Sequence, residues 1–254
     1  MVFGLGGIIA VLVALFVFTL VLFFVSRILF RIMMLVTTIA FVVLIIMGIL
    51  VLKDAYALSG ELQNSENAFI LQNNNLTVAG FLINMSSQKP MLLNSSQLAN
   101  FVNKTPPVSI MNESIANTFY INLSAFTDYN FSVNFSGFEY LNKTDIITIL
   151  ESANATDTIA GFMASNDPQL KNIQMNYAKK LAAQQIQEQY NDSIELKSQV
   201  FLLLFGSAVS NVGTKFIFLE AKDKKLFIEP ARITFTFINY LPDSIITASQ
   251  EMKT

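Results

Sequence analysis

Two apolar runs close together at the N-terminus dominate the hydropathy pattern of the chain. Residues 2–26 form the first run and residues 32–52 the second, and the short connector between them carries the only charges of this part, Arg27 and Arg31. A bilayer core of about 30 Å is crossed by about 20 helical residues. Each run is therefore long enough for one crossing, and we predict a transmembrane helical hairpin in residues 1–52.

Arg27 and Arg31 predict the orientation of this hairpin. Positive residues in short loops stay on the cytoplasmic side, and two arginines four residues apart can reach the same headgroup layer. The turn is then cytoplasmic and both termini are extracytoplasmic, as in a two-pass protein of the cell membrane. A competing interpretation takes Ala55-Tyr56-Ala57 as a signal cleavage site, which would release everything that follows.

Small residues recur every four positions in the first run, at Gly6, Ala10 and Ala14. Such stripes allow helices to approach closely in lipid. The stripe is explained by helix packing against the second run, and a docking face for another membrane subunit is the alternative.

Beyond residue 52 the pattern changes to short alternating segments and then to helical periodicity. Residues 53–66 favour a stalk or linker helix. Residues 67–143 favour short strands and turns, since apolar side chains alternate with Asn and Ser over residues 129–136. Residues 144–254 favour an α+β region with an amphipathic helix. We therefore predict a membrane-anchored α+β protein, with a β-rich and then mixed α/β extracytoplasmic part after the hairpin.

Individual elements follow from the same patterns. Asp167-Pro168 is a good helix start, and an apolar stripe continues from there to about residue 190. The apolar residues 200–212 are too few to cross a bilayer and predict a buried element. At the C-terminus, residues 215–220 and 225–229 read as a β-hairpin, and alternating apolar residues in 233–237 read as a last strand.

Asn-x-Ser/Thr sequons are far more frequent than chance in the predicted outer part. The 202 residues after position 52 hold all 22 asparagines and 32 Ser or Thr residues, for which chance predicts three or four sequons. Eleven are present, at Asn75, Asn84, Asn94, Asn103, Asn112, Asn122, Asn130, Asn134, Asn142, Asn154 and Asn191. This excess predicts N-glycosylation of a surface-exposed domain.

Turn chemistry offers a second explanation of the same excess. Asn, Ser and Thr all stabilise turns through side-chain hydrogen bonds to the backbone, so a loop-rich domain accumulates sequons without being glycosylated. Both explanations place these asparagines on the surface.

Composition excludes several classes of function. The part after residue 52 has a net charge of −4 and no basic stripe, which argues against nucleic acid. The chain has no cysteine and no histidine, which removes disulfides, thiolate nucleophiles and the usual zinc ligands and general base. We expect no metal and no cofactor.

Two groups of side chains have the residue types of a catalytic site. Ser193 and Lys197 stand four apart, as a Ser–Lys pair would need, but the same spacing suits a surface helix. Glu220, Asp223 and Glu229 are close together in sequence as paired acids would be, but interleaved lysines indicate a solvated charged turn. We therefore predict that the protein is not an enzyme.

The leading hypothesis is a non-enzymatic cell-surface or envelope protein, whose hairpin binds the lipid bilayer and whose glycosylated outer domain meets a protein partner or a surface lattice. An accessory subunit of a larger membrane complex, docked through the hairpin, is the alternative. A weaker alternative is an extracytoplasmic hydrolase.

Overall fold

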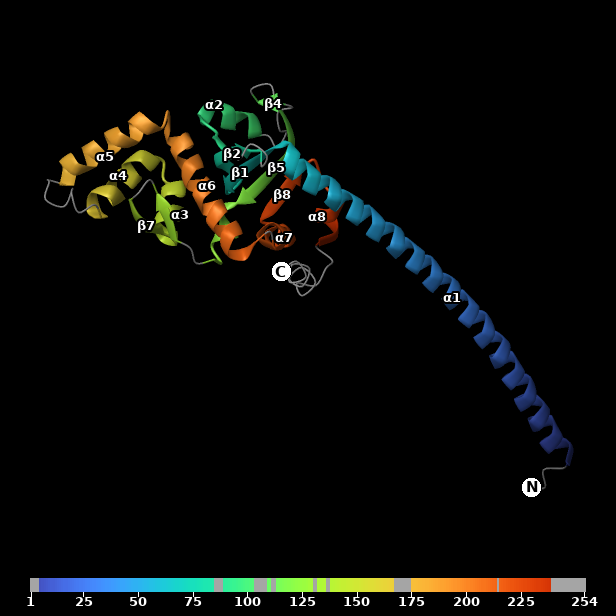
Figure 1. The fold of residues 1–254 in the computed structure, drawn as a ribbon. Coiled ribbons are helices and arrows are strands. Elements are labelled where there is room, and N and C mark those ends of the chain that lie inside the picture. The colour runs from blue at the N-terminus through green and yellow to red at the C-terminus, as the bar shows by residue number, and fades with distance from the viewer. Residues whose placement is uncertain are drawn as a thin grey trace. The chain divides into compact units, whose positions relative to one another are not determined.

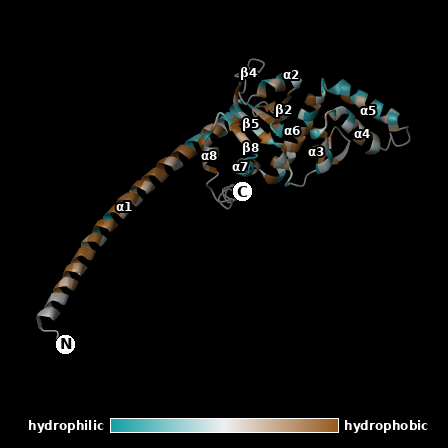
Figure 2. Cartoon of the chain, turned by 180° about the vertical axis from the view of Figure 1, so that it is seen from behind, coloured by the Kyte–Doolittle hydropathy of each residue, from teal (hydrophilic) through white to brown (hydrophobic). Residues whose placement is uncertain are grey.

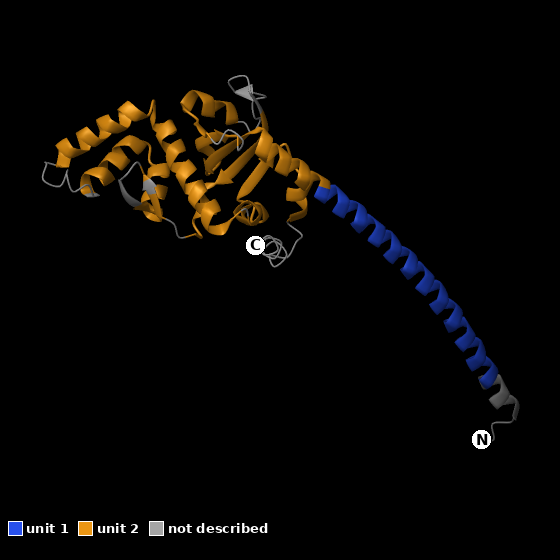
Figure 3. Cartoon of the chain, viewed as in Figure 1, with its two compact units in different colours: residues 1–52 blue, residues 53–254 orange. Residues whose placement is uncertain are grey.

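The protein has a mixed α/β fold, with one long apolar helix at the N-terminus and a sheet in the C-terminal part. The computed structural model describes residues 5–84, 89–102, 109–110, 113–129, 132–135, 138–166, 175–213 and 215–238. Two compact units make up the chain, residues 1–52 and residues 53–254 (Figure 3).

Helix α1 (Leu5–Asn64) is continuous over 60 residues. The two-helix hairpin predicted for residues 1–52 is not shown, since the helix continues through the expected turn at Arg27 and Arg31. A physical reason is that residues 26–31 contain neither glycine nor proline, so nothing in the local sequence interrupts the helical hydrogen bonds.

The second unit is built on a six-stranded sheet of order β3-β2-β1-β5-β4, with β8 also paired to β5. Its strands are β1 (Glu66–Asn73), β2 (Leu76–Ile83), β3 (Met91–Leu92), β4 (Ser109–Ile110), β5 (Glu113–Asn122) and β8 (Leu226–Glu229). The central pair β1–β5 is parallel and the other pairs are antiparallel. Asn74 and Asn75 adopt positive φ in the tight β1–β2 turn, a conformation that asparagine tolerates well.

Three phenylalanines in register form the centre of the main core. Phe69 pairs with Phe81 on β2 and with Phe119 on β5, and its ring centroid lies 5.1 and 4.8 Å from theirs, in stacked geometry. Phe201 and Phe205 of helix α6 (Ser193–Val212) cover these rings. Such aromatic pairs add about 0.5–1.5 kcal/mol each beyond the area they bury.

The opposite face of the sheet packs on a smaller core. Ala68, Ile70 and Tyr120 belong to it, and it is covered by α2 (Ser95–Leu98) and the 3-10 helix η1 (Ala99–Phe101). The residues of β1 and β5 are thus buried on both faces. The alternation expected of a strand with one solvated face does not apply to β5, where Phe119 and Tyr120 are both inside.

The remaining elements lie between β5 and β8 in sequence, except α8, which follows β8. They are η2 (Leu123–Phe126), β6 (Ser132–Phe135), β7 (Phe138–Asn142), α3 (Lys143–Glu151), α4 (Ala155–Asn166), α5 (Met175–Gln189), α7 (Lys215–Lys222) and α8 (Ile233–Ile238). Helix α6 lies between the sheet and helices α3 to α5 (Figure 1). The predicted buried element at residues 200–212 is therefore the greater part of α6.

The predicted C-terminal β-hairpin is wrong in its first strand. Residues 215–220 belong to helix α7, and only residues 226–229 form a strand, β8, which pairs with β5. Residues 233–238 are likewise helix α8 rather than a strand. Short apolar runs fit either period, and here the buried residues Phe235 and Ile238 lie three apart on one helical face.

The hydroxyl of Ser198 on α6 forms hydrogen bonds with backbone groups of the sheet where β3 ends. Its hydroxyl accepts a hydrogen bond from the Gly80 amide of β2 at 3.1 Å. The same oxygen lies 2.9 Å from the carbonyl oxygens of Leu93 and Ile194, to which it can donate. The side chain is fully buried. Its hydroxyl gives the Gly80 amide the hydrogen-bond acceptor that a longer β3 would have provided.

We expect Ser198→Ala to lower the free energy of unfolding by about 1–3 kcal/mol, because the buried Gly80 amide loses its acceptor. The measurement is urea unfolding of the full-length protein in detergent, followed by near-ultraviolet circular dichroism. Ser210→Ala on the exposed part of the same helix is the matched control. Equal stability of the two variants would contradict this role of Ser198.

Candidate functional site

The outer surface of α1 is apolar along most of its length. Figure 2 shows hydrophobic residues along most of this helix, up to its more hydrophilic C-terminal end, and its large side chains from Leu12 to Leu52 are largely exposed. It is the one helix among the described residues that by itself is long and apolar enough to cross a membrane. This favours membrane association of the chain through its N-terminal part.

The residues predicted to orient and pack the anchor all lie on α1. Arg27 and Arg31 are exposed near the middle of its apolar part. Gly6, Ala10 and Ala14 follow one face of the helix by their spacing, and Ala14 is exposed. The side chains of residues 5–11 lie outside the described part of the structure.

The described sequon asparagines lie at the surface or half-buried near it. Four are exposed: Asn75, Asn142, Asn154 and Asn191. Three are half-buried: Asn84, Asn94 and Asn122. Asn103, Asn112 and Asn130 lie outside the described residues, and for Asn134 only the backbone in β6 is described.

Several of these asparagines cap a helix with their side-chain oxygen. Asn94 accepts a hydrogen bond from the Gln97 amide at the start of α2, and Asn142 from the Asp145 amide at the start of α3. Asn122 does the same for η2. The turn-forming explanation of the sequons therefore has a visible physical basis, and it leaves the amide nitrogen of each of these three side chains available.

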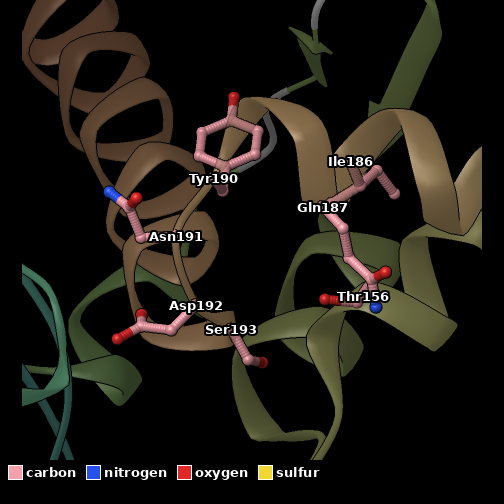
Figure 4. Close-up of a pocket in the computed structure, with 7 residues that line it drawn as sticks. All are labelled: Thr156, Ile186, Gln187, Tyr190, Asn191, Asp192 and Ser193. Carbon is pink, nitrogen blue, oxygen red and sulfur yellow. The ribbon is translucent and has the colours of Figure 1, made fainter.

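A cavity of about 340 Å³ lies where helices α4, α5 and α6 meet. Its lining comprises Thr156 of α4, Ile186 and Gln187 of α5, and residues 190–193 between α5 and α6. Figure 4 shows residues 190–193 on one side of this pocket and Gln187 and Thr156 on the other. Small-molecule sites usually have volumes of about 300–1,000 Å³, so the pocket is large enough for a small ligand.

Two side chains of the pocket wall are also structural caps. Asp192 caps α6 through the Glu195 amide at 2.7 Å, and its other carboxylate oxygen accepts from the amide and hydroxyl of Ser95 at 2.9 and 2.8 Å. Burial raises the pKa of Asp192, but these hydrogen bonds outweigh it and hold the pKa below its ordinary value. Ser193 accepts from the Ala155 amide at 3.1 Å, at the start of α4.

Ser193 and Lys197 do not act on one another as a catalytic pair. Ser193 bonds the Ala155 amide, whereas Lys197 donates to the Ser152 carbonyl at 2.6 Å, at the end of α3. Burial lowers the pKa of Lys197. The two side chains thus bind the two ends of the α3–α4 connection, which is a structural role.

A partly buried ionic network, which sequence reasoning missed, joins the end of α1 to the start of α8. Arg232 lies 3.4 Å from Asp54 and also binds Glu61, and it donates to Asn117 of β5 at 2.7 Å. Asp54 in turn accepts from the amide and hydroxyl of Thr234 at 2.9 and 2.8 Å. Burial raises the pKa of Asp54, but the hydrogen bonds from Thr234 and Arg232 hold it below its ordinary value.

The sequence gives little sign of this network, because its members are 56 to 180 positions apart. Nothing next to Asp54 in the sequence identifies Arg232 and Thr234 as its partners. Residues 53–64 are consequently more than a stalk: Leu58 is buried in the main core and Glu61 also accepts from Asn117 at 3.0 Å.

Glu220 is a buried acid and not part of a solvated turn. It lies on α7 with 2% of its surface exposed and accepts a hydrogen bond from the Tyr129 hydroxyl at 2.7 Å. Lys225 lies 3.8 Å from Glu220 but 2.7 Å from Asp128. Burial raises the pKa of Glu220 despite Tyr129 and Lys225. Asp223 is exposed and Glu229 half-buried on β8, and no described hydrogen bond joins either of them to Glu220.

Within the described parts of the chain, no group of three or more acidic side chains is placed to hold a metal ion. No protein-family model, no curated protein and no solved structure matches this chain.

We expect Glu220→Gln to stabilise the protein at pH 7.5. A raised pKa in the folded state means that Glu220 contributes stability below its unfolded pKa of about 4.5 and loses it as the pH rises through the folded pKa. Glutamine is neutral throughout, so its advantage in urea unfolding should shrink as the pH falls toward 4.5. A variant less stable than the natural protein at pH 7.5 would show that attraction to Lys225 dominates; Asp223→Asn is the exposed control.

Proposed function

We propose that the protein is a non-enzymatic cell-surface or envelope membrane protein. Its N-terminal helix anchors it in the bilayer, and its glycosylated outer domain meets a protein partner or a surface lattice. The observation that carries the proposal is the length of the apolar, exposed part of α1 together with the sequons that all follow it.

The anchor is proposed to cross the membrane twice. The apolar part of α1, residues 5–52, would be about 70 Å long as a straight helix at 1.5 Å per residue. A bilayer core is only about 30 Å thick, so a straight helix would leave about half of these apolar side chains in water. A turn near Arg27 and Arg31 removes this conflict, since it places both runs in lipid and the only two charges at the membrane surface.

The same two arginines support an orientation with both termini outside the cell. All eleven sequons then lie on the extracytoplasmic side, where N-glycans are attached to surface residues. The exposed Asn75 and Asn142 are the described positions best suited to carry them. Asn154 and Asn191 are also exposed, but their side-chain nitrogens donate to Asp157 at 2.6 Å and to Glu195 at 2.7 Å.

An accessory subunit of a larger membrane complex is the second candidate function. It is favoured by the spacing of Gly6, Ala10 and Ala14 on one helical face. Mild solubilisation separates the two: a stable stoichiometric complex would favour the subunit.

Cysteine labelling tests the two-pass topology cleanly, because the chain has no native cysteine. We expect a membrane-impermeant maleimide to label Val2→Cys and Tyr56→Cys from outside intact cells. Phe30→Cys should be labelled only after the membrane is opened. Val2→Cys and Tyr56→Cys labelled from opposite sides would contradict the hairpin and favour a single crossing.

Glycopeptide mass spectrometry of protein purified from its native membranes tests the surface role. We expect glycans on several sequons, including the exposed Asn75 and Asn142, because their side-chain nitrogens face solvent without a described hydrogen bond. If every sequon asparagine is bare, the glycoprotein proposal fails and turn chemistry alone explains the sequons. A full-length mass would also exclude cleavage after Ala57.

A further inference from the structure

We propose that the pocket between α4, α5 and α6 binds a neutral sugar ring. Six of its seven lining residues carry polar side chains: Thr156, Gln187, Tyr190, Asn191, Asp192 and Ser193. Of these, the Asn191 amide also donates to Glu195 at 2.7 Å and the Ser193 hydroxyl also accepts from the Ala155 amide at 3.1 Å, so Gln187 and Thr156 are the main hydrogen-bonding groups for a ligand. Ile186 is the single apolar side chain. Such a lining matches a ligand that is uncharged and rich in hydroxyl groups.

Charged ligands fit the lining poorly. No lysine or arginine is among the lining residues, so a phosphate or a sugar acid has no cationic partner. The carboxylate of Asp192 already accepts three hydrogen bonds, from Ser95 and Glu195, which reduces its ability to attract a cation. The scarcity of apolar surface argues equally against a lipid chain.

The hydrogen-bonding groups and the volume suit a sugar. Amide and hydroxyl side chains can each donate and accept hydrogen bonds. Gln187 and Thr156 can therefore bind a sugar hydroxyl whether it acts as a donor or as an acceptor. Tyr190 stacks on Phe135 with centroids 6.4 Å apart and planes 26° apart, which holds its ring in place. The volume of about 340 Å³ admits one ring rather than a long oligosaccharide.

Two sequons meet at this pocket, which gives the sugar two sources. Thr156 is the hydroxyl residue of the sequon at Asn154, and Ser193 is that of the sequon at Asn191. The Ser193–Ala155 hydrogen bond of 3.1 Å joins the two sequons directly. The ring is therefore either a free sugar from the surroundings or part of a glycan on Asn154 or Asn191, and this second source rests on the proposed glycosylation.

The test compares two forms of the full-length protein in nanodiscs, one made in a host without N-glycosylation and one from native membranes. Saturation-transfer NMR with glucose, galactose, mannose and N-acetylglucosamine measures binding, and glucose 6-phosphate is the charged probe. For the unglycosylated form we expect a neutral sugar to bind and Gln187→Ala to weaken it at least fivefold. Gln189→Ala, an exposed glutamine on the same helix that does not line the pocket, should have no effect.

The possible results distinguish a free sugar from the chain's own glycan. They also distinguish failure of the pocket proposal from failure of the proposed glycosylation. Free-sugar binding sensitive to Gln187→Ala supports the pocket even if Asn154 and Asn191 are bare, in which case only the glycan part of the proposed function fails. If free sugar binds the unglycosylated form but not the native form, and hydrogen exchange at residues 186–193 is slower in the native form, the chain's own glycan occupies the pocket. No neutral sugar bound by the unglycosylated form, binding unaffected by Gln187→Ala, or stronger binding of glucose 6-phosphate would overturn the proposal.

Discussion

Hydrogen bonds from the first two turns of α6 connect four elements of the second unit, residues 53–254. Asp192 binds the start of α2, Ser193 the start of α4, Lys197 the end of α3 and Ser198 strand β2 beside the short edge strand β3. Each bond satisfies a backbone group that a helix end or a short edge strand leaves without a partner. Because four elements depend on one short segment, the position of α6 determines the positions of the others. The pocket beside residues 190–193 is a consequence of this convergence of helix ends.

Although the net charge of the chain is small, its second unit contains ion pairs between charged side chains. Arg232 and Asp54 are partly buried, with 11% and 15% of their side-chain surfaces exposed, and a pair withdrawn from water stabilises only when its remaining hydrogen-bonding groups are also satisfied. Asn117 and Thr234 supply those bonds. The network ties residues 232–234 to the last turns of α1, so the residues that follow the apolar part of α1 are part of the folded domain. Because the last turns of α1 pack in this domain, they are not a free spacer.

Local patterns predicted some elements of the fold well and others poorly, for identifiable reasons. Strand β2 covers residues 76–83, within the segment predicted to form short strands and turns, because its β-branched and apolar residues follow a clear Asn-rich turn. Helix α8 was predicted as a strand, since Thr234 and Phe235 favour strands, yet Asp54 caps its first turn from almost 180 positions away. Tertiary partners of that kind override local propensity. Ser193 and Lys197 both lie on helix α6, in line with their helical spacing in the sequence, but the pocket around Ser193 depends on α4, whose approach no local pattern reveals.

Helix capping and N-glycosylation use different atoms of the asparagine side chain, so the two explanations of the sequons are compatible. In Asn94, Asn122 and Asn142 the side-chain oxygen caps a helix, whereas an N-glycan is joined to the side-chain nitrogen. An asparagine can therefore start a helix and carry a sugar at once, and a helix start is by geometry exposed at the surface. Selection for caps would enrich Asn at these positions, but capping alone does not require Ser or Thr two residues later. Helix capping therefore explains the asparagine of such a sequon but not the Ser or Thr at its third position.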